Sequence, residues 1–401
     1  MLRRGWQLEL RMTRSHRGRI ALIHGNDGTD VRVGKICRSL SRMGYDTHFI
    51  GWDRRPNAKK EIDLGGAQSH ILRLETAFGK GTPATMLCFA AHTWRTLAHL
   101  RPETVCCVNE EYCLLAVPLK HLYYRHLICD IFDALSDRLS VRSWPYRAAA
   151  GIVSALSHGA ADCLIATDDV RRGRFGRHQG KCAVIRNYPE DPGEAFWRKN
   201  VEGPVKVYVS GSLFLQKGLK QILAAVEAME DVQIVAAGPF YDRFAKEEFA
   251  NHPKVVYNGI VTARRSLELA AECDAIFAFY APTKSLEFTS PNKIYDALCV
   301  GRPAIINREV DVAPWIMENG LGMQCAYEDV EALREIIASL RDRRGGLSEY
   351  SERLRAVFAK GYSWERMEER LAYVYRNPKT AARELDKVLG ARPAATAGRQ
   401  A

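Results

Sequence analysis

Short apolar runs alternate with amphipathic helical patterns along most of the chain, and this alternation is the strongest constraint on its fold. Such alternation is typical of the α/β class, in which helices connect the strands of parallel sheets. The pattern begins at Arg19–His24, breaks at the turn-rich run Asn187–Gly193 and restarts at Val205–Ser210. The 401 residues are enough for two cores. We therefore predict two doubly wound domains, with a ligand cleft between the loops at the carboxyl ends of their strands.

Composition and cysteine spacing argue against several classes of protein. No run approaches the roughly 18 uncharged apolar residues of a membrane span. The first twenty residues contain six arginines, but no apolar core of a signal peptide follows them. The 11 cysteines include no C-x-x-C pair, which disfavours zinc sites and disulfide frameworks. We therefore expect a cytoplasmic protein with reduced thiols.

The net charge of +11 is unevenly distributed along the chain. Residues 1–200 contain 31 Lys and Arg against 20 Asp and Glu, whereas the remainder contains 27 of each. This asymmetry predicts that the first half meets an anionic partner, such as nucleic acid, an acidic membrane surface or a phosphate-bearing acceptor. The chain lacks a recognised nucleic-acid-binding motif, so we expect no nucleic acid partner. Solubility alone remains an alternative explanation of the charge.

The segment Ser290–Ile306 is the most informative local stretch, and it reads as a loop, a short helix, a Gly-Arg-Pro turn and a buried strand. The amide-rich start of a helix attracts phosphate, and Lys293 adds a cation in its first turn. Asp296 follows three residues later on the same helical face, where its carboxylate could accept ribose hydroxyls. These features suit a nucleotide diphosphate, although an ordinary αβ unit with a solvated lysine and aspartate would have the same spacing.

A second loop, Gly211–Gly218, follows the strand Val205–Ser210 and places Lys217 just ahead of a helix. That lysine could reach a phosphate, although a lysine in this position is often merely solvated. Neither loop matches the P-loop or the G-x-G-x-x-G fingerprint, which disfavours NTPase and dehydrogenase functions.

Together these motifs resemble those of GT-B glycosyltransferases, most closely family 4 (glycosyl transferases group 1). Gly211–Gly218 is similar to the family's G-x-L-x-x-x-K-G loop, and Pro291–Ile306 is similar to its P-N-K-x-Y-E-x-x-x-x-G-x-P-V-I segment. Tyr362–Glu365 reads Y-S-W-E, as in the family. In the first half, Asp30–Tyr45 and Asp130–Asp133 resemble the family's D-x-R-V and D-x-H-D regions. The similarity runs roughly from residue 19 to residue 376.

The resemblance implies transfer of a sugar from a UDP- or GDP-sugar to an acceptor held by the first domain, with no cofactor. By this resemblance, Lys217 and Lys293 bind the diphosphate with Asn292 beside them. Asp296 takes the place of the glutamate that binds the ribose, and Glu287 lies near the donor sugar or ribose. Stabilisation of the leaving group by lysines and a helix terminus is electrostatic and needs no metal. The sequence also has no D-x-D triplet, which disfavours the metal-dependent GT-A type.

The chain departs from the family pattern at three places. Ser212 stands after Gly211 where arginine is usual, which removes one positive charge from the diphosphate site. Glu287 and Asp296 are one residue further apart than the family's two glutamates, and Phe132 stands where histidine is common. These departures leave open a catalytically silent nucleotide-binding partner protein. A sugar-nucleotide 2-epimerase, which shares the architecture, would need more acid/base side chains than the sequence offers.

Asp133 is the candidate catalytic residue, because it lies just past the end of a predicted central strand of the first domain. In an inverting reaction it would take the acceptor's proton as the general base. In a retaining reaction the departing phosphate takes that proton, and Asp133 only orients the acceptor. An aspartate that merely caps a turn is the alternative. His24 and Asp30, near the end of the first strand, are further acceptor-site candidates.

Cations and aromatic residues alternate after Asp133, and together with Trp94, Arg95 and the arginine-rich start they could contact anionic lipid headgroups. The residues in this stretch are Arg138, Arg142, Trp144, Tyr146 and Arg147. A lipid-linked glycan would be a fitting acceptor for an enzyme of cell-surface polysaccharide or exopolysaccharide synthesis at the cytoplasmic face of the inner membrane.

The expected domains are a basic extension (1–18), an acceptor-binding Rossmann-like domain (19–190), a linker (191–204), a nucleotide-sugar-binding Rossmann-like domain (205–361), a crossover helix (362–378) and a partly disordered tail (379–401).

Overall fold

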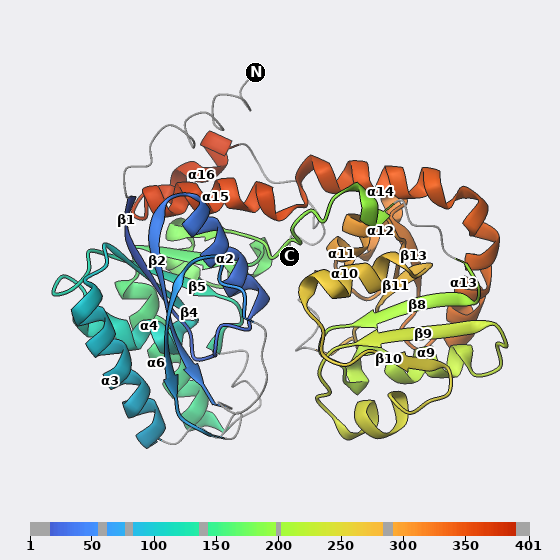
Figure 1. Cartoon of the computed structure of the whole chain (residues 1–401), viewed down its shortest axis with the longest axis horizontal. Coiled ribbons are helices and arrows are strands. Elements are labelled where there is room, and N and C mark those ends of the chain that lie inside the picture. The colour runs from blue at the N-terminus through green and yellow to red at the C-terminus, as the bar shows by residue number, and fades with distance from the viewer. Residues whose placement is uncertain are drawn as a thin grey trace. The chain divides into compact units, whose positions relative to one another are not determined.

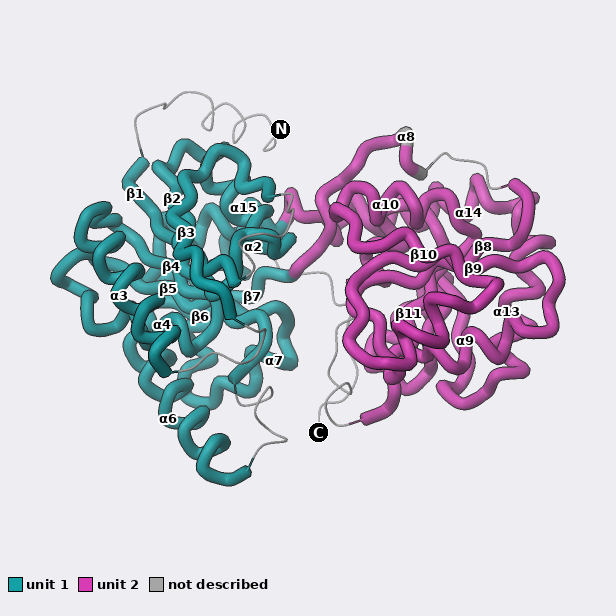
Figure 2. The backbone as a smooth tube through the Cα atoms, turned by 60° about the horizontal axis from the view of Figure 1, so that its bottom comes forward, with its two compact units in different colours: residues 1–186, 367–391 teal, residues 187–366, 392–401 magenta. Residues whose placement is uncertain are grey.

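The chain forms two compact units, which are coloured separately in Figure 2. One unit combines Met1–Arg186 with Met367–Ala391, and the other is built on Asn187–Arg366. The boundary near the C-terminus falls inside a helix, so the chain passes back into the first unit without leaving helical structure. The computed structural model describes residues 17–54, 62–76, 83–135, 143–197, 202–283 and 292–389.

The first unit contains a seven-stranded parallel sheet in the order β3-β2-β1-β4-β5-β6-β7 (Figure 1). Its strands are β1 (Arg17–Ile23), β2 (Tyr45–Asp53), β3 (Gln68–Arg73), β4 (Thr104–Val108), β5 (His126–Ile131), β6 (Cys163–Ala166) and β7 (Cys182–Val184). Its helices are α2 (Val31–Arg42), α3 (Pro83–Leu100), α4 (Glu110–Ala116), α6 (Trp144–Ala160), α7 (Asp169–Gly173), α15 (Trp364–Arg376) and α16 (Ala381–Leu389). Figure 1 shows α3, α4 and α6 on one face of the sheet and α2 and α15 on the other. The central strand β4 is buried along its whole length, as expected for a parallel sheet covered on both faces.

The second unit contains a six-stranded parallel sheet in the order β10-β9-β8-β11-β12-β13. Its strands are β8 (Val205–Ser210), β9 (Val232–Ala237), β10 (Val255–Tyr257), β11 (Ala275–Ala278), β12 (Ala304–Asn307) and β13 (Gly322–Cys325). Its helices are α8 (Glu194–Trp197), α9 (Leu219–Val226), α10 (Ala263–Ala271), α11 (Asn292–Val300), α12 (Ala313–Glu318), α13 (Val330–Arg343) and α14 (Leu347–Gly361). A core of β-strand residues packs against α9 and α13 on one face. The predicted α/β class with two parallel sheets is confirmed.

One helix lies where the sequence pattern predicts a tail. The stretch Ala381–Leu389 forms α16, which buries Ala381 and Leu385. Asp386 of this helix accepts a hydrogen bond from Arg370 of α15 at 2.5 Å. The four-residue spacing of Ala381 and Leu385 puts them on one face, which is the signal that identifies the helix.

The turn between β8 and α9 depends on a glycine. Gly218 has φ of +70°, and a Cβ atom added there would lie 2.6 Å from the Cβ atom of Phe279. We expect Gly218→Ala to lower the free energy of unfolding by about 2–4 kcal/mol, because backbone strain and overpacking act together. Urea denaturation measures this loss. Gly151→Ala in helix α6 is the control, since its Cβ would meet open space and should not destabilise the protein.

Candidate functional site

The carboxyl edge of the second sheet holds a small cavity of about 10 Å³, which has room for about one water molecule. It lies where the adjacent strands β8 and β11 end. Its lining residues are Val209, Ser210, Leu213, Lys217, Phe277, Ala278, Phe279, Tyr280 and Lys293. The two lysines come from different loops, and the sheet topology brings them to the same place.

Lys293 lies in the first turn of α11 and forms an ion pair with Asp296, with 2.8 Å between Nζ and Oδ2. Both side chains are 19% exposed. Burial lowers the pKa of Lys293, but the adjacent Asp296 carboxylate outweighs that effect and leaves the pKa above its ordinary value. Lys293 is therefore a permanent cation at neutral pH. In this structure Asp296 is engaged with that lysine.

Lys217 occupies a less favourable environment for a charge. Its ammonium lies 5.4 Å from the ring centre of Phe214 and 5.1 Å from that of Tyr280. Burial lowers the pKa of Lys217 to about 8, and repulsion from Lys293 acts in the same direction. Cation–π contacts compensate only part of this cost. An anion placed near the two ammonium groups would relieve the repulsion and raise the pKa of Lys217 toward its ordinary value.

The loop after β8 approaches Lys293 closely. Gly211 has φ of +91°, and an added Cβ would lie 3.4 Å from Cε of Lys293. The neighbouring Ser212 is half-buried in the same loop. Asn292 is the first residue of α11 and is exposed. Glu287 lies outside the described residues. Thus the structure gathers Gly211, Lys217, Lys293 and Asp296 in one region of the second unit.

In the first unit, Asp133 follows β5 and its side chain is 65% exposed. Its Oδ1 lies 3.3 Å from Nη2 of Arg171. The backbone N–H groups of Phe132 and Asp133 donate to Oδ1 of Asn109, at 2.9 Å and 3.3 Å. Asn109 itself has φ of +69° and ψ of 162°, a conformation normally restricted to glycine. Sequence reasoning missed Asn109, because no motif marks a strained asparagine.

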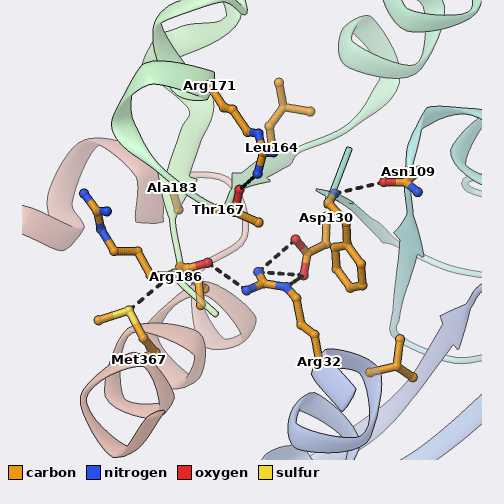
Figure 3. Close-up of polar contacts among 12 residues, drawn as sticks. Arg32, Asn109, Asp130, Leu164, Thr167, Arg171, Ala183, Arg186 and Met367 are labelled. Carbon is orange, nitrogen blue, oxygen red and sulfur yellow. Dashed lines mark hydrogen bonds and ion pairs between the residues drawn. The ribbon is translucent and has the colours of Figure 1, made fainter. Parts of the chain in front are cut away.

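A buried ion pair lies beneath this loop, at the carboxyl ends of the strands (Figure 3). Nη2 of Arg32 is 3.0 Å and 3.1 Å from the two carboxylate oxygens of Asp130, and Nη1 donates to the Ile185 carbonyl at 2.9 Å. The two side chains are 3% and 0% exposed. Burial raises the pKa of Asp130 even though the Arg32 cation opposes this effect. The guanidinium of Arg32 also lies over the ring of Phe132, 5.0 Å from its centre. The buried ion pair therefore packs against Phe132, the residue that precedes Asp133.

The other two candidates in the first unit have structural contacts. The carboxylate of Asp30 accepts hydrogen bonds from the backbone N–H groups of Arg32 and Val33, which makes it the N-cap of α2. His24 packs edge-on against Tyr112, with 5.8 Å between the ring centres, and lies 5.9 Å from Phe132. His24 therefore lies beside the Asp133 loop.

The aromatic part of the predicted membrane-contacting stretch is exposed. Trp144 and Tyr146 begin helix α6 and are 72% and 60% exposed, and Arg147 follows them. Trp94 is 42% exposed on α3. Arg138 and Arg142 lie outside the described residues. Among the helices that the structure describes, none has the length and apolar character needed to span a bilayer.

Solved structures with the same architecture include glycosyltransferases of the GT-B fold. Sucrose-phosphate synthase from Thermosynechococcus elongatus superposes with a TM-score of 0.71 and 15% identity, covering 91% of this chain and 100% of that one. Anabaena HepE in complex with UDP-glucose gives a TM-score of 0.67 and 12% identity, covering 90% and 100%. WaaG, a glycosyltransferase involved in lipopolysaccharide biosynthesis, gives 0.62 and 12%, covering 88% and 98%. No family model and no curated protein sequence matches the chain.

These similarities show that the chain has the GT-B fold, and they confirm the predicted fold. At identities of 12–15% they define the architecture and not the reaction.

Proposed function

We propose that this protein is a glycosyltransferase that moves a sugar from a UDP- or GDP-linked donor to a glycan acceptor. One observation carries the proposal: Lys217 and Lys293 line a single cavity at the carboxyl edge of the second sheet, where folds of this class bind ligands. The complex of HepE with UDP-glucose supports a nucleotide-sugar as the donor.

In this proposal the two lysines stabilise the negative charge that develops on the departing nucleotide diphosphate. The backbone of Gly211 and Ser212 and the start of α11 at Asn292 lie beside the phosphates. Asp296 exchanges its ion pair with Lys293 for the ribose hydroxyls, and Glu287 contacts the donor sugar or ribose. Because the lysines carry the stabilising charge, we expect transfer to persist in the presence of a chelator.

The acceptor is assigned to the first unit. Asp133 acts as the general base if the reaction inverts the anomeric carbon, since its exposed carboxylate can reach a hydroxyl. If the reaction retains configuration, the leaving phosphate takes the proton and Asp133 orients the acceptor. His24 and Asp30 help to hold that acceptor. The stereochemistry of the product, read by NMR, separates these two roles.

Screening nucleotide-sugars for release of UDP or GDP tests the proposal, with and without a membrane extract as the source of acceptor. We expect one donor to turn over only when the extract is present. Binding without turnover would instead indicate the silent nucleotide-binding protein, which Ser212 in place of an arginine favours. Conversion of the donor to an isomeric nucleotide-sugar would identify a 2-epimerase.

We further propose that the acceptor is lipid-linked and that α6 contacts the membrane that carries it. The exposed Trp144 and Tyr146 support this proposal. Sedimentation with anionic and with neutral liposomes should show preferential binding to the anionic vesicles. Replacing both residues by serine should weaken it, whereas Tyr241→Ser, at a tyrosine that is also 60% exposed, should not. Equal partitioning between the two kinds of vesicle would reject a contact with anionic lipid, and no sedimentation with either would reject membrane contact.

The low pKa of Lys217 makes donor binding depend on pH. A diphosphate binds the protonated form of Lys217. The affinity for UDP should therefore be highest below the pKa of about 8 and should fall as the pH rises through it. We expect UDP to bind about tenfold more weakly at pH 9 than at pH 7. Isothermal titration calorimetry measures this change. Lys217→Arg should flatten the profile, because a guanidinium stays charged over the whole range.

A further inference from the structure

The second unit contains another cavity of about 300 Å³ at the opposite edge of its sheet from the two lysines. Asp274 precedes β11, Pro303 precedes β12, and Met323 lies near the start of β13, so the cavity lies at the amino ends of these strands. It is covered by α13, by the 3₁₀ turn Arg344–Gly346 and by α14. Its lining residues are Asp274, Pro303, Met323, Leu340, Arg343, Arg344, Gly346, Leu347, Glu349, Tyr350 and Arg353.

One side of this cavity is fixed by a hydrogen-bonded arginine. Arg344 donates from Nε and Nη2 to the two carboxylate oxygens of Asp274, at 2.6 Å and 2.8 Å. It also donates to the carbonyls of Gly203 and Pro204, each at 2.8 Å. The charge of Arg344 is therefore balanced by Asp274, and the contacts hold the 3₁₀ turn against the sheet.

The interior and the rim of the cavity differ in chemistry. Pro303, Met323, Leu340 and Leu347 supply apolar surface to the interior. Such a surface offers few partners for the hydroxyl groups of a sugar or nucleoside, and burying those groups without partners is costly. The volume lies at the lower end of the range for small-molecule sites. A compact apolar group therefore suits the interior.

The rim carries two exposed arginines, Arg343 and Arg353. The guanidinium of Arg353 lies over the ring of Tyr350, 5.0 Å from its centre, and Nε of Arg343 donates to Oγ of Ser339 at 3.2 Å. Burial raises the pKa of Tyr350 to about 12, so its phenol is neutral at physiological pH. Apart from the Asp274–Arg344 pair, Glu349 is the only acidic residue among the lining residues that the structure describes. The rim therefore has an excess of positive charge.

We propose that this cavity binds an anionic amphiphile, whose phosphate or carboxylate group contacts Arg343 and Arg353 while its apolar body enters the interior. Guanidinium groups form strong hydrogen bonds with both kinds of anion. The ligand is either a free alkyl phosphate or carboxylate or the corresponding part of a membrane lipid. This site is separate from the donor site, and it does not depend on the proposed sugar transfer.

Calorimetry with three probes tests the chemistry: octyl phosphate below its micellar concentration, inorganic phosphate and octyl glucoside. We expect octyl phosphate to bind most tightly, because it alone combines the charge with the apolar body. Arg343→Gln combined with Arg353→Gln should weaken its binding by about tenfold or more. Lys246→Gln combined with Lys360→Gln removes the same charge from exposed positions outside the cavity and should leave binding unchanged.

A steric variant tests the location. Gly346 lines the cavity, has a negative φ of −101°, and a Cβ added there would meet no atom within 4 Å. Gly346→Trp should fill the entrance and abolish octyl phosphate binding while thermal unfolding stays unchanged. The adjacent Gly345→Trp is the matched control, because Gly345 also has open space but does not line the cavity.

Vesicles of phosphatidylglycerol distinguish the two sources of the ligand. The vesicle test uses the protein with Trp144→Ser and Tyr146→Ser, which lacks the proposed α6 contact. Vesicle binding that Gly346→Trp removes from this protein indicates a membrane lipid, whereas binding of octyl phosphate alone indicates a free metabolite. Octyl phosphate binding that survives both Gly346→Trp and the double arginine replacement would overturn the proposal. Equal affinity for octyl phosphate and inorganic phosphate would also overturn it.

Discussion

Replacing Lys217 and Lys293 together by glutamine should weaken UDP binding by roughly a hundredfold or more, because each lysine is expected to supply a charge-assisted hydrogen bond to the diphosphate. Both lysines line one cavity, and the charge of Lys293 lowers the pKa of Lys217. The two ammonium groups therefore interact with each other. The single variants should therefore not be additive. Calorimetry on the four proteins of this double-mutant cycle measures both effects.

The two single variants should differ in their effect on the free energy of unfolding. Lys217→Gln removes a cation whose pKa burial depresses, so it should stabilise the ligand-free protein or leave it unchanged. Lys293→Gln breaks the ion pair with Asp296 and should destabilise it. Lys220→Gln, at an exposed lysine that is the second residue of α9, is the control and should alter neither property. Unaltered UDP affinity in the double variant would contradict the donor site.

Arg32→Leu should lower the free energy of unfolding by about 3–5 kcal/mol, because it leaves the buried carboxylate of Asp130 without its cation. Without Arg32, burial and repulsion from the nearby Asp30 carboxylate act unopposed and raise the pKa of Asp130 further. The variant should therefore lose less stability at acidic pH, where Asp130 takes up a proton. Urea denaturation at pH 5 and pH 8 measures both the loss and its sign.

Two further variants show whether the effect belongs to the buried pair. Combining Arg32→Leu with Asp130→Leu removes the unpaired charge and should recover much of the lost stability. Arg38→Leu, on the same helix, removes a pair in which the side chain of Asp63 is 68% exposed. That change should cost less than about 1 kcal/mol. Similar losses for Arg32→Leu and Arg38→Leu would contradict the importance of burial.

The arrangement of the second unit could be predicted because its signals are local. Parallel strands are continuous apolar runs, and the loops after them carry the polar residues, so Lys217 and Lys293 could each be placed at a helix start. The spacing also placed Lys293 and Asp296 on one helical face. Their direct ion pair and the lowered pKa of Lys217 could not be predicted, because both depend on burial that only the packed structure supplies.

The contacts that support the first-unit loop were not predictable for a different reason. Arg32 and Asp130 are 98 residues apart, and they meet because the ends of parallel strands gather at one edge of the sheet. Asn109 holds the Asp133 loop from a backbone conformation that its residue type disfavours. Short-range propensity opposes such a conformation, so a single sequence gives no sign of it.

The division of the chain has a consequence for shortened versions of this protein. The second unit is built on one uninterrupted stretch, Asn187–Arg366, which is inserted between the two pieces of the first. A stop codon after Arg366 would spare every strand of both sheets, yet it would remove nearly all of α15 and the whole of α16 from the first unit. With them would go the hydrogen bond from Arg370 to the carbonyl of Val184 on β7. Trimming the C-terminus should therefore damage the half of the protein that is encoded first.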